Sequence, residues 1–157
     1  MAVEIERKFL VKRELWAAVN SSNSIGIRQA YLSDQPDKTI RVRTAGNKGY
    51  LTIKGMAKGI TRAEFEWEIP VEEAHELIDN FCSEVIEKTR HYVFFQQKRW
   101  EVDEFRGSNH GLLVAEIELQ SEDENFEKPA WIGEEVTHDI RYLNSQLIRN
   151  PYQQWPK

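Results

Sequence analysis

Apolar and polar residues alternate with a period of two along most of this sequence, which predicts a mainly β fold of the α+β class. Successive side chains of a strand point to opposite faces, so this pattern gives each strand one apolar and one polar face. The first such segment, Val3–Val11, is charged at positions 4, 6 and 8 and apolar at 3, 5, 9 and 11. Clusters of Gly, Asn and Pro separate the segments, as in antiparallel hairpins.

Seven further segments have the strand pattern, and three have helical spacing of apolar residues. The expected strands are 27–32, 39–44, 50–54, 62–69, 85–95, 98–105 and 112–119. The expected helices are 12–20, 71–81 after Pro70, and a C-terminal helix that starts near Thr137 and ends near Pro151. We therefore expect eight antiparallel strands flanked by a few helices.

Composition limits the classes of protein to which the chain can belong. Its 157 residues, 40% of them hydrophobic, suffice for one domain with a sizeable core, which we expect to span 1–157. The net charge of −5 argues against a nucleic-acid or membrane-surface binder. Cys82 is the only cysteine, the first residues do not read as a secretion signal, and no apolar run approaches the roughly 20 residues that span a bilayer. These features predict a cytoplasmic protein.

The charged residues of the expected strands are sorted by sign into rows whose members lie about 7 Å apart. The basic positions are Arg41, Arg43, Lys54, Lys88 and Arg90, and the acidic ones are Glu4, Glu6, Glu64, Glu66, Glu68, Glu116 and Glu118, with Asp103 and Glu101 sharing a face. An antiparallel sheet often has one hydrated, charged face, but scattered charges would serve that purpose equally well. Grouped like charges indicate ligands of opposite sign.

The two kinds of row suit two kinds of ligand. Paired carboxylates suit hard divalent cations such as Mg²⁺, and rows of Arg and Lys suit phosphate oxygens. If the sheet closes on itself, the charged faces would line its interior and the apolar faces would pack against helices outside. Burying so many charges is costly unless metal and polyanion balance them, so we expect a hydrated, ligand-binding tunnel.

The opening Glu4-Ile-Glu-Arg-Lys8 resembles the Glu-x-Glu-x-Lys signature of the CYTH proteins, also called triphosphate tunnel metalloenzymes. Further segments that match in the family's order are Arg41-Val-Arg43, Leu51-Thr-Ile-Lys-Gly55, Glu87-Lys-Thr-Arg90, Ala115-Glu-Ile-Glu-Leu119 and Trp131-Ile-Gly-Glu-Glu-Val-Thr137. The resemblance covers nearly the whole chain and is greatest to the short bacterial inorganic triphosphatases. It implies a closed eight-stranded antiparallel β-barrel whose charged tunnel binds triphosphate with Mg²⁺ or Mn²⁺, two ions being bound with the substrate.

The resemblance also implies a role for each matching residue. The metal-binding carboxylates would be Glu4, Glu6, Glu64, Glu66, Asp103, Glu116 and Glu118, and the phosphate-binding cations would be Lys8, Arg41, Arg43, Lys54, Lys88 and Arg90. Lys8 and Tyr31 would be catalytic and would orient or deprotonate the attacking water. Because a lysine near several cations has a lowered pKa, an alkaline pH optimum is a further hypothesis.

Tripolyphosphate is the small-molecule substrate that the sequence favours, since no aromatic cage for a base is apparent. Trp16, Trp67, Trp100 and Trp131 are expected in the core, where large aromatic residues usually lie. A class IV adenylyl cyclase, a nucleoside triphosphatase or a thiamine triphosphatase are the alternatives within the family. A polyphosphate-binding module without turnover is another alternative, but such a module would gain nothing from acidic rows. Similar proteins are commonly homodimers.

Overall fold

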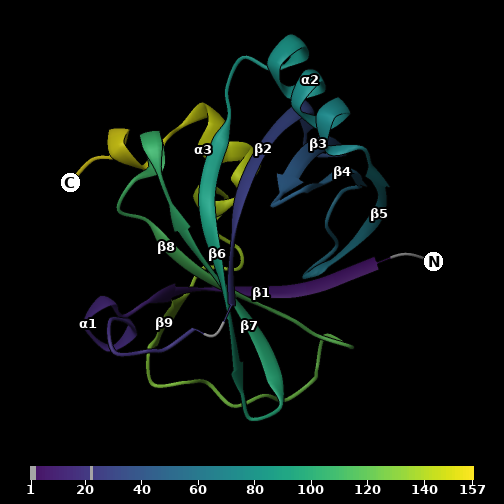
Figure 1. The fold of residues 1–157 in the computed structure, drawn as a ribbon. Coiled ribbons are helices and arrows are strands. Elements are labelled where there is room, and N and C mark those ends of the chain that lie inside the picture. Colours follow the sequence, from purple (N-terminus) through teal and green to yellow (C-terminus); the bar gives the residue numbers. More distant parts are fainter. Residues whose placement is uncertain (1–2, 22) are drawn as a thin grey trace.

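The computed structural model describes residues 3–21 and 23–157, which form mainly one antiparallel sheet (Figure 1). Residues 1, 2 and 22 of the predicted domain lie outside this description. The strands are β1 (Val3–Val11), β2 (Asn23–Gln35), β3 (Lys38–Ala45), β4 (Lys48–Lys54), β5 (Thr61–Ile69), β6 (Ile86–Phe95), β7 (Lys98–Phe105), β8 (Leu113–Glu118) and β9 (Ile132–Glu135). The helices are α1 (Arg13–Trp16), α2 (Val71–Phe81) and α3 (Asn144–Arg149), with 3₁₀ turns at Gly107–Asn109, Ile140–Tyr142 and Tyr152–Gln154.

Eight of the strands close into a barrel, which confirms the predicted architecture. Their order is β5-β4-β3-β2-β6-β7-β8-β1, and β1 pairs back with β5. Glu4 of β1 lies opposite Arg62 of β5, whereas two residues later Glu6 lies opposite Glu118 of β8. Strand β9 pairs with the last residues of β1 and lies outside the closed ring. The first strand of the sequence therefore joins the two ends of the sheet.

Some elements differ from the expected ones for identifiable reasons. Strand β2 is longer than expected because it pairs with both β3 and β6. The expected helix over 12–20 is reduced to the single turn of α1. The C-terminal helix is present but is divided at Leu143, whose backbone is extended (φ −67°, ψ 133°). Strand β9 was not expected, since its four residues are too short to show a period. Within the described ranges, no helix is long and apolar enough to cross a membrane.

The hydrophobic core lies outside the barrel wall, as the alternation predicts for a sheet with a charged interior. On one side, Phe9, Trp100 and Trp131 pack with edge-to-face aromatic contacts at centroid separations of 5.7 and 6.0 Å. On another side, Ala74 and Ile78 of α2 pack against apolar residues of β2 and β3. Burial of Trp100 and Trp131 confirms that these two tryptophans belong to the core.

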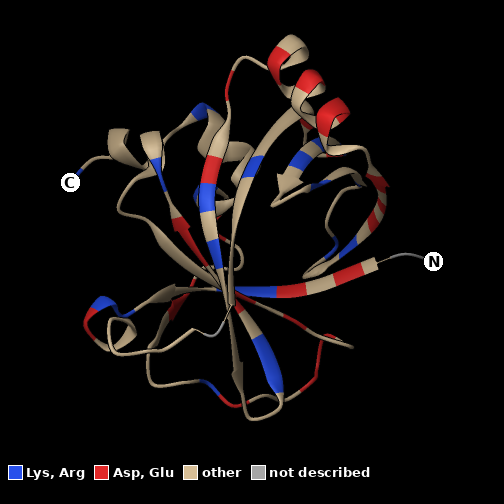
Figure 2. Cartoon of the chain, in the orientation of Figure 1, with Lys and Arg blue, Asp and Glu red and all other residues tan. Residues whose placement is uncertain are grey.

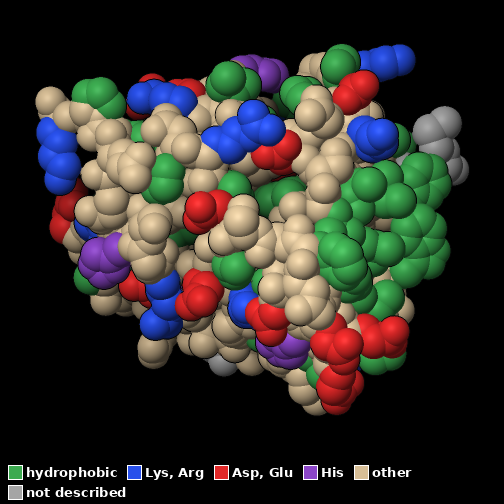
Figure 3. All heavy atoms as spheres, turned by 90° about the horizontal axis from the view of Figure 1, so that it is seen from above, with side chains coloured by type: hydrophobic (Ala, Val, Ile, Leu, Met, Phe, Trp, Pro, Cys, Tyr) green, Lys and Arg blue, Asp and Glu red, His purple; other side chains and the backbone are tan. Residues whose placement is uncertain are grey.

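The outer face of β5 is not covered by a helix. Helix α2 packs on β2, β3 and β4, and the side chains of Phe65 and Trp67 remain 44% and 51% exposed with stacked rings. Viewed from above (Figure 3), hydrophobic side chains gather on the side where Figure 1 draws β5 and the N-terminus. The expectation that Trp67 lies in the core is wrong, because α2 packs on β2, β3 and β4 and leaves this face of β5 exposed.

Gly49 permits the close approach of α2 to the sheet, and we expect Gly49→Ala to destabilise the protein. An added Cβ would lie 2.8 Å from Cβ of Ala74 and 3.0 Å from the carbonyl oxygen of Ile69. Overpacking of this kind costs about 1–3 kcal/mol of the free energy of unfolding, which urea denaturation would measure. Gly26→Ala is the matched control, because nothing lies within 4 Å of its added Cβ. Equal stabilities of the two variants would contradict the packing argument.

Candidate functional site

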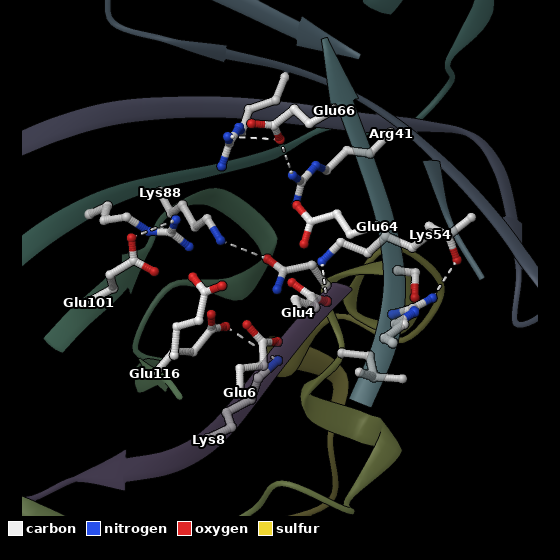
Figure 4. Close-up of a pocket in the computed structure, with 18 of the residues that line it drawn as sticks. Glu4, Glu6, Lys8, Arg41, Lys54, Glu64, Glu66, Lys88, Glu101 and Glu116 are labelled. Atoms are coloured by element: carbon white, nitrogen blue, oxygen red, sulfur yellow. Dashed lines mark hydrogen bonds and ion pairs between the residues drawn. The ribbon is translucent and has the colours of Figure 1, made fainter. Parts of the chain in front are cut away.

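The barrel encloses a cavity of about 270 Å³ that receives side chains from all eight barrel strands (Figure 4). Seven glutamates and eight lysines or arginines line it, in keeping with the charges that Figure 2 shows along the strands. The predicted site residues that line it are Glu4, Glu6, Lys8, Tyr31, Arg41, Arg43, Lys54, Glu64, Glu66, Lys88, Arg90, Glu116 and Glu118. Asp103 alone among the predicted site residues is absent from the lining. Their assigned roles stay predictions, but the alternating pattern correctly places them together.

Acidic side chains face one another where β7, β8 and β1 are neighbours. Glu101 lies directly opposite Glu116, and Glu6 lies directly opposite Glu118. Like charges in such cross-strand positions repel each other. Burial, together with the carboxylates of Glu116 and Glu4, raises the pKa of Glu6 to about 8. We call this group, made of Glu6, Glu101, Glu116 and Glu118, the acidic wall.

A second pair of carboxylates lies where β1 meets β5. Glu4 binds Lys54 with an Oε1–Nζ distance of 2.8 Å. Burial alone would raise the pKa of Glu4, but Lys54 outweighs it and holds the pKa at about 2. Burial and a hydrogen bond with Glu4 raise the pKa of Glu64 to about 7. Of these two neighbouring carboxylates, Glu4 therefore forms the ion pair with Lys54, and Glu64 is the one whose pKa is raised.

The arginines of β3 are held by a carboxylate of β5. Arg41 and Arg43 each approach Oε2 of Glu66, at 3.3 and 3.4 Å, and the hydroxyl of Thr52 donates to the same oxygen at 2.7 Å. Burial and the neighbouring guanidinium of Arg41 lower the pKa of Arg43 to about 10. The sequence assigned Glu66 to metal binding, whereas here its carboxylate orients two arginines toward the cavity.

Asp103 is buried behind the cavity wall and binds two basic residues that the sequence predicts to bind phosphate. Its Oδ2 lies 2.7 Å from Nζ of Lys88, and its Oδ1 lies 2.8 Å from Nε of Arg90. Burial would raise the pKa of Asp103, but Arg90 and Lys88 outweigh it and hold the pKa well below its usual range. Burial, with a contribution from Arg90, lowers the pKa of Lys88 to about 8. Both oxygens of Asp103 are thus engaged by cations.

Lys8 lies at the end of the cavity that the C-terminal segment closes. Its Nζ lies 3.5 Å from Glu116 and donates to the carbonyl oxygen of Tyr142 at 3.2 Å. Burial favours the neutral amine, but the carboxylates of Glu116 and Glu6 outweigh it and raise the pKa of Lys8. The hypothesis of a lowered pKa at Lys8 is therefore wrong, because carboxylates rather than cations surround this amine.

The donor set fits hard divalent cations. Within the described residues, no three acidic, histidine or cysteine side chains are already grouped so as to hold a metal ion. Lysines bind Glu4 and Glu116 instead, while Glu6 and Glu118 lie in the acidic wall with raised pKa values. Clustered carboxylate oxygens, such as those of the acidic wall, are the ligands that Mg²⁺ and Mn²⁺ prefer. The carboxylates therefore suit such an ion once Lys8 and Lys54 bind another anion in place of Glu116 and Glu4.

Several lining residues were not assigned to the site from the sequence. Arg99 and Glu101 precede Asp103 at intervals of two on β7, so the same alternation would have indicated them. Arg62, to which the sequence analysis assigned no role, also lines the cavity and donates to Oγ1 of Thr39 at 2.9 Å. Asn144 enters from the start of α3, where no strand pattern exists to predict it.

Comparison with protein families agrees with this geometry. The model of the CYTH domain matches residues 2–152. The chain belongs to the CYTH family. A protein of Acetivibrio thermocellus named inorganic triphosphatase is 50% identical over 153 residues, which cover 97% of each chain. Another of that name, from Nitrosomonas europaea, is 35% identical over 148 residues, which cover 92% of this chain and 95% of the relative.

Solved CYTH-like structures share the barrel. The crystal structure of an inorganic triphosphatase superposes with a TM-score of 0.65 at 32% identity, covering 100% of this chain and 99% of that one. A putative adenylyl cyclase from Hippeastrum, described as having a dominant triphosphatase activity, gives a TM-score of 0.53 at 14% identity. This superposition covers 77% of this chain and 80% of the cyclase chain. The second likeness shows the fold alone.

Proposed function

We propose that this protein hydrolyses the terminal phosphate of inorganic triphosphate in its tunnel, with Mg²⁺ or Mn²⁺ as the metal. The observation that carries the proposal is a closed tunnel whose acidic wall faces lysines and arginines. Membership of the CYTH family and two relatives named inorganic triphosphatase support it. We place the reaction in the cytoplasm, in keeping with a single, unpaired cysteine.

The ion pairs of the free tunnel suggest how substrate binds. Lys54 and Lys8 exchange their carboxylate partners for phosphate oxygens, which frees Glu4 and Glu116 to join Glu6 and Glu118 as metal ligands. Glu4, Glu6, Glu116 and Glu118 would hold divalent cations, which would supply neutralising charge for the phosphate oxygens and a coordinated water of lowered pKa. Lys8, once it has left Glu116, stabilises charge on the phosphate as an ammonium group. Metal and triphosphate would therefore enter together.

The position of the tryptophans favours an inorganic substrate over a nucleotide or thiamine triphosphate. Trp16, Trp67, Trp100 and Trp131 do not line the cavity, where Tyr31 is the sole aromatic residue among the described ones. A class IV adenylyl cyclase needs a site for adenine and ribose, because the 3′-hydroxyl of the ribose is its nucleophile. The cavity offers charge along its whole length and little apolar surface for a base.

Product analysis with three substrates tests the proposal. Purified protein would receive tripolyphosphate, ATP or thiamine triphosphate, each with Mg²⁺, with Mn²⁺ or with a chelator. We expect metal-dependent release of orthophosphate and pyrophosphate from tripolyphosphate, with the other two substrates at least about tenfold slower, since groups of the wrong shape lose transition-state binding. Cyclic AMP and pyrophosphate from ATP would assign the protein to the cyclases. Binding of tripolyphosphate without turnover would indicate a binding module.

A further inference from the structure

Gln29 is a buried polar residue on the inner face of β2 to which the proposed function assigns no role. It lies two residues before Tyr31, on the same face of the strand, and is 0% exposed. Tyr31 lines the cavity whereas Gln29 does not, so the amide lies behind the cavity wall. Burying an amide group is costly unless both of its ends are hydrogen-bonded. A glutamine at this position therefore calls for an account of what each end binds.

The amide nitrogen of Gln29 binds the hydroxyl of Tyr31. Nε2 donates to Oη of Tyr31 at 3.2 Å, so the phenolic oxygen is the acceptor. A hydroxyl group has one hydrogen, and an amide nitrogen does not accept it. The hydrogen of the Tyr31 hydroxyl therefore points away from Gln29. Among residues 3–21 and 23–157 this hydroxyl makes no other hydrogen bond, which leaves its hydrogen free to donate into the cavity.

The amide oxygen of Gln29 and a guanidinium nitrogen of Arg43 are both buried without a partner. Arg43 of β3 lies directly opposite Gln29, and on the other side β6 places the apolar Ile86 opposite it. Within the described chain, neither Oε1 of Gln29 nor Nε of Arg43 makes a hydrogen bond. Side chains opposite each other in a strand pair are neighbours. Since a guanidinium only donates, the oxygen is the end of the amide that suits Arg43, and the nitrogen is left for Tyr31.

The neighbours of Gln29 thus select the direction in which its amide group faces. A reversed amide would place two N–H donors beside the positive charge of Arg43 and would turn an acceptor toward Tyr31. The hydroxyl of Tyr31 would then donate to the amide rather than to a ligand. The observed orientation leaves Tyr31 as a donor in the cavity that Lys8 also lines. A donor at this place suits phosphate oxygens, which accept hydrogen bonds.

We propose that Gln29 is a positioning residue, which holds the hydroxyl of Tyr31 so that this group donates its hydrogen to an oxygen of the bound triphosphate. The inference rests on the proposed function. Gln29 itself touches neither substrate nor metal and acts only through Tyr31. Tyr31 accordingly keeps its proton and stabilises charge on the phosphate, and it is not the base that takes a proton from water.

Steady-state kinetics with tripolyphosphate test the inference in a double-mutant cycle of Gln29→Met and Tyr31→Phe. Methionine has nearly the length of glutamine but carries no donor. We expect Gln29→Met to lower kcat/KM roughly tenfold, the effect of weakening one hydrogen bond to a charged group. In the Tyr31→Phe background, which has no hydroxyl to hold, the same replacement should change kcat/KM by less than about twofold. Equal losses in the two backgrounds, or no loss in Gln29→Met, would overturn the inference.

Stability and a second replacement distinguish positioning from packing. Gln29→Met removes a buried amide whose oxygen has no partner, so its midpoint of urea denaturation should be no lower than that of the wild type. A clearly lower midpoint would show that the amide serves the fold and would overturn the inference. Gln29→Leu differs in shape but also lacks the donor, and it should lose activity to the same degree. Gln35→Met is the control, because Gln35 is exposed on the same strand and does not line the cavity.

Binding of tripolyphosphate separates this inference from the proposed function. If the wild type released no orthophosphate, the proposed function would fail, but the rise in Tm that tripolyphosphate causes would still report on the hydroxyl of Tyr31. That rise should be reduced to a similar degree in Gln29→Met, Tyr31→Phe and the double variant. Equal rises in Gln29→Met and the wild type would then overturn the inference. Hydrolysis by the wild type with additive losses in the cycle would overturn the inference alone and leave the proposed function standing.

Discussion

Glu6→Gln is expected to abolish most triphosphate hydrolysis while the protein keeps its fold and its Tm at neutral pH. Glu6 lies opposite Glu118 and its pKa is raised to about 8 by burial and by Glu116 and Glu4. The metal-free carboxyl therefore holds its proton near pH 7, and a neutral amide of the same size replaces it at little cost. Bound metal needs the ionised carboxylate, so we expect activity to fall by roughly a hundredfold or more.

Thermal melts and orthophosphate release over a series of metal concentrations would check this result. Glu104→Gln is the control, since Glu104 lies on the exposed outer side of β7 and pairs only with His91. The half-saturating metal concentration should rise in Glu6→Gln and stay unchanged in Glu104→Gln. A fully active Glu6→Gln would remove Glu6 from the metal site. A large loss of Tm would show that Glu6 stabilises the fold, contrary to its place in the acidic wall.

The alternation of side chains between the two faces of a strand explains why so much of the site could be predicted. In β1, residues 4, 6 and 8 share a face whatever the strand's neighbours are, and the same holds for 41 and 43 of β3 and for 116 and 118 of β8. The face of a strand on which a side chain lies is a local property. The alternation in the sequence therefore predicted the charged interior and the external core. Closure of the barrel depends on pairing between β1 and β5, which no local pattern encodes.

The unpredicted features all depend on distances between segments that are remote in sequence. The sequence shows that Asp103 faces inward, but only the structure shows that both its oxygens bind cations of β6. Lys8 was expected among cations, whereas β8 places Glu116 directly opposite it. The exposure of Trp67 follows from the packing of α2 on β2, β3 and β4, and the entry of Asn144 into the tunnel follows from the path of the C-terminal segment. Each outcome is set by tertiary packing rather than by local periodicity.

Asp103→Asn is expected to have the opposite consequence to Glu6→Gln and to destabilise the protein by about 3–5 kcal/mol, the usual cost of leaving buried charges without their partner. Asp103 is 1% exposed and binds Lys88 and Arg90. Its pKa is lowered in the folded protein, so its contribution is present above the pKa of the unfolded chain and is lost as the pH falls below about 4. The difference between wild type and variant should accordingly be constant from pH 5 to about 7 and shrink in acid.

Urea denaturation of four variants would test this account and distinguish it from a role of Asp103 in metal binding. Asp79→Asn is the matched control, because Asp79 forms an exposed ion pair with Arg28 and its loss should cost less than about 1 kcal/mol. Adding Lys88→Met to Asp103→Asn should restore part of the stability, since it removes one of the unpaired buried cations. Lys88→Met alone completes the double-mutant cycle. If Asp103→Asn were as stable as Asp79→Asn but required much more metal for activity, Asp103 would be a metal ligand rather than the residue that positions Lys88 and Arg90 for the phosphates.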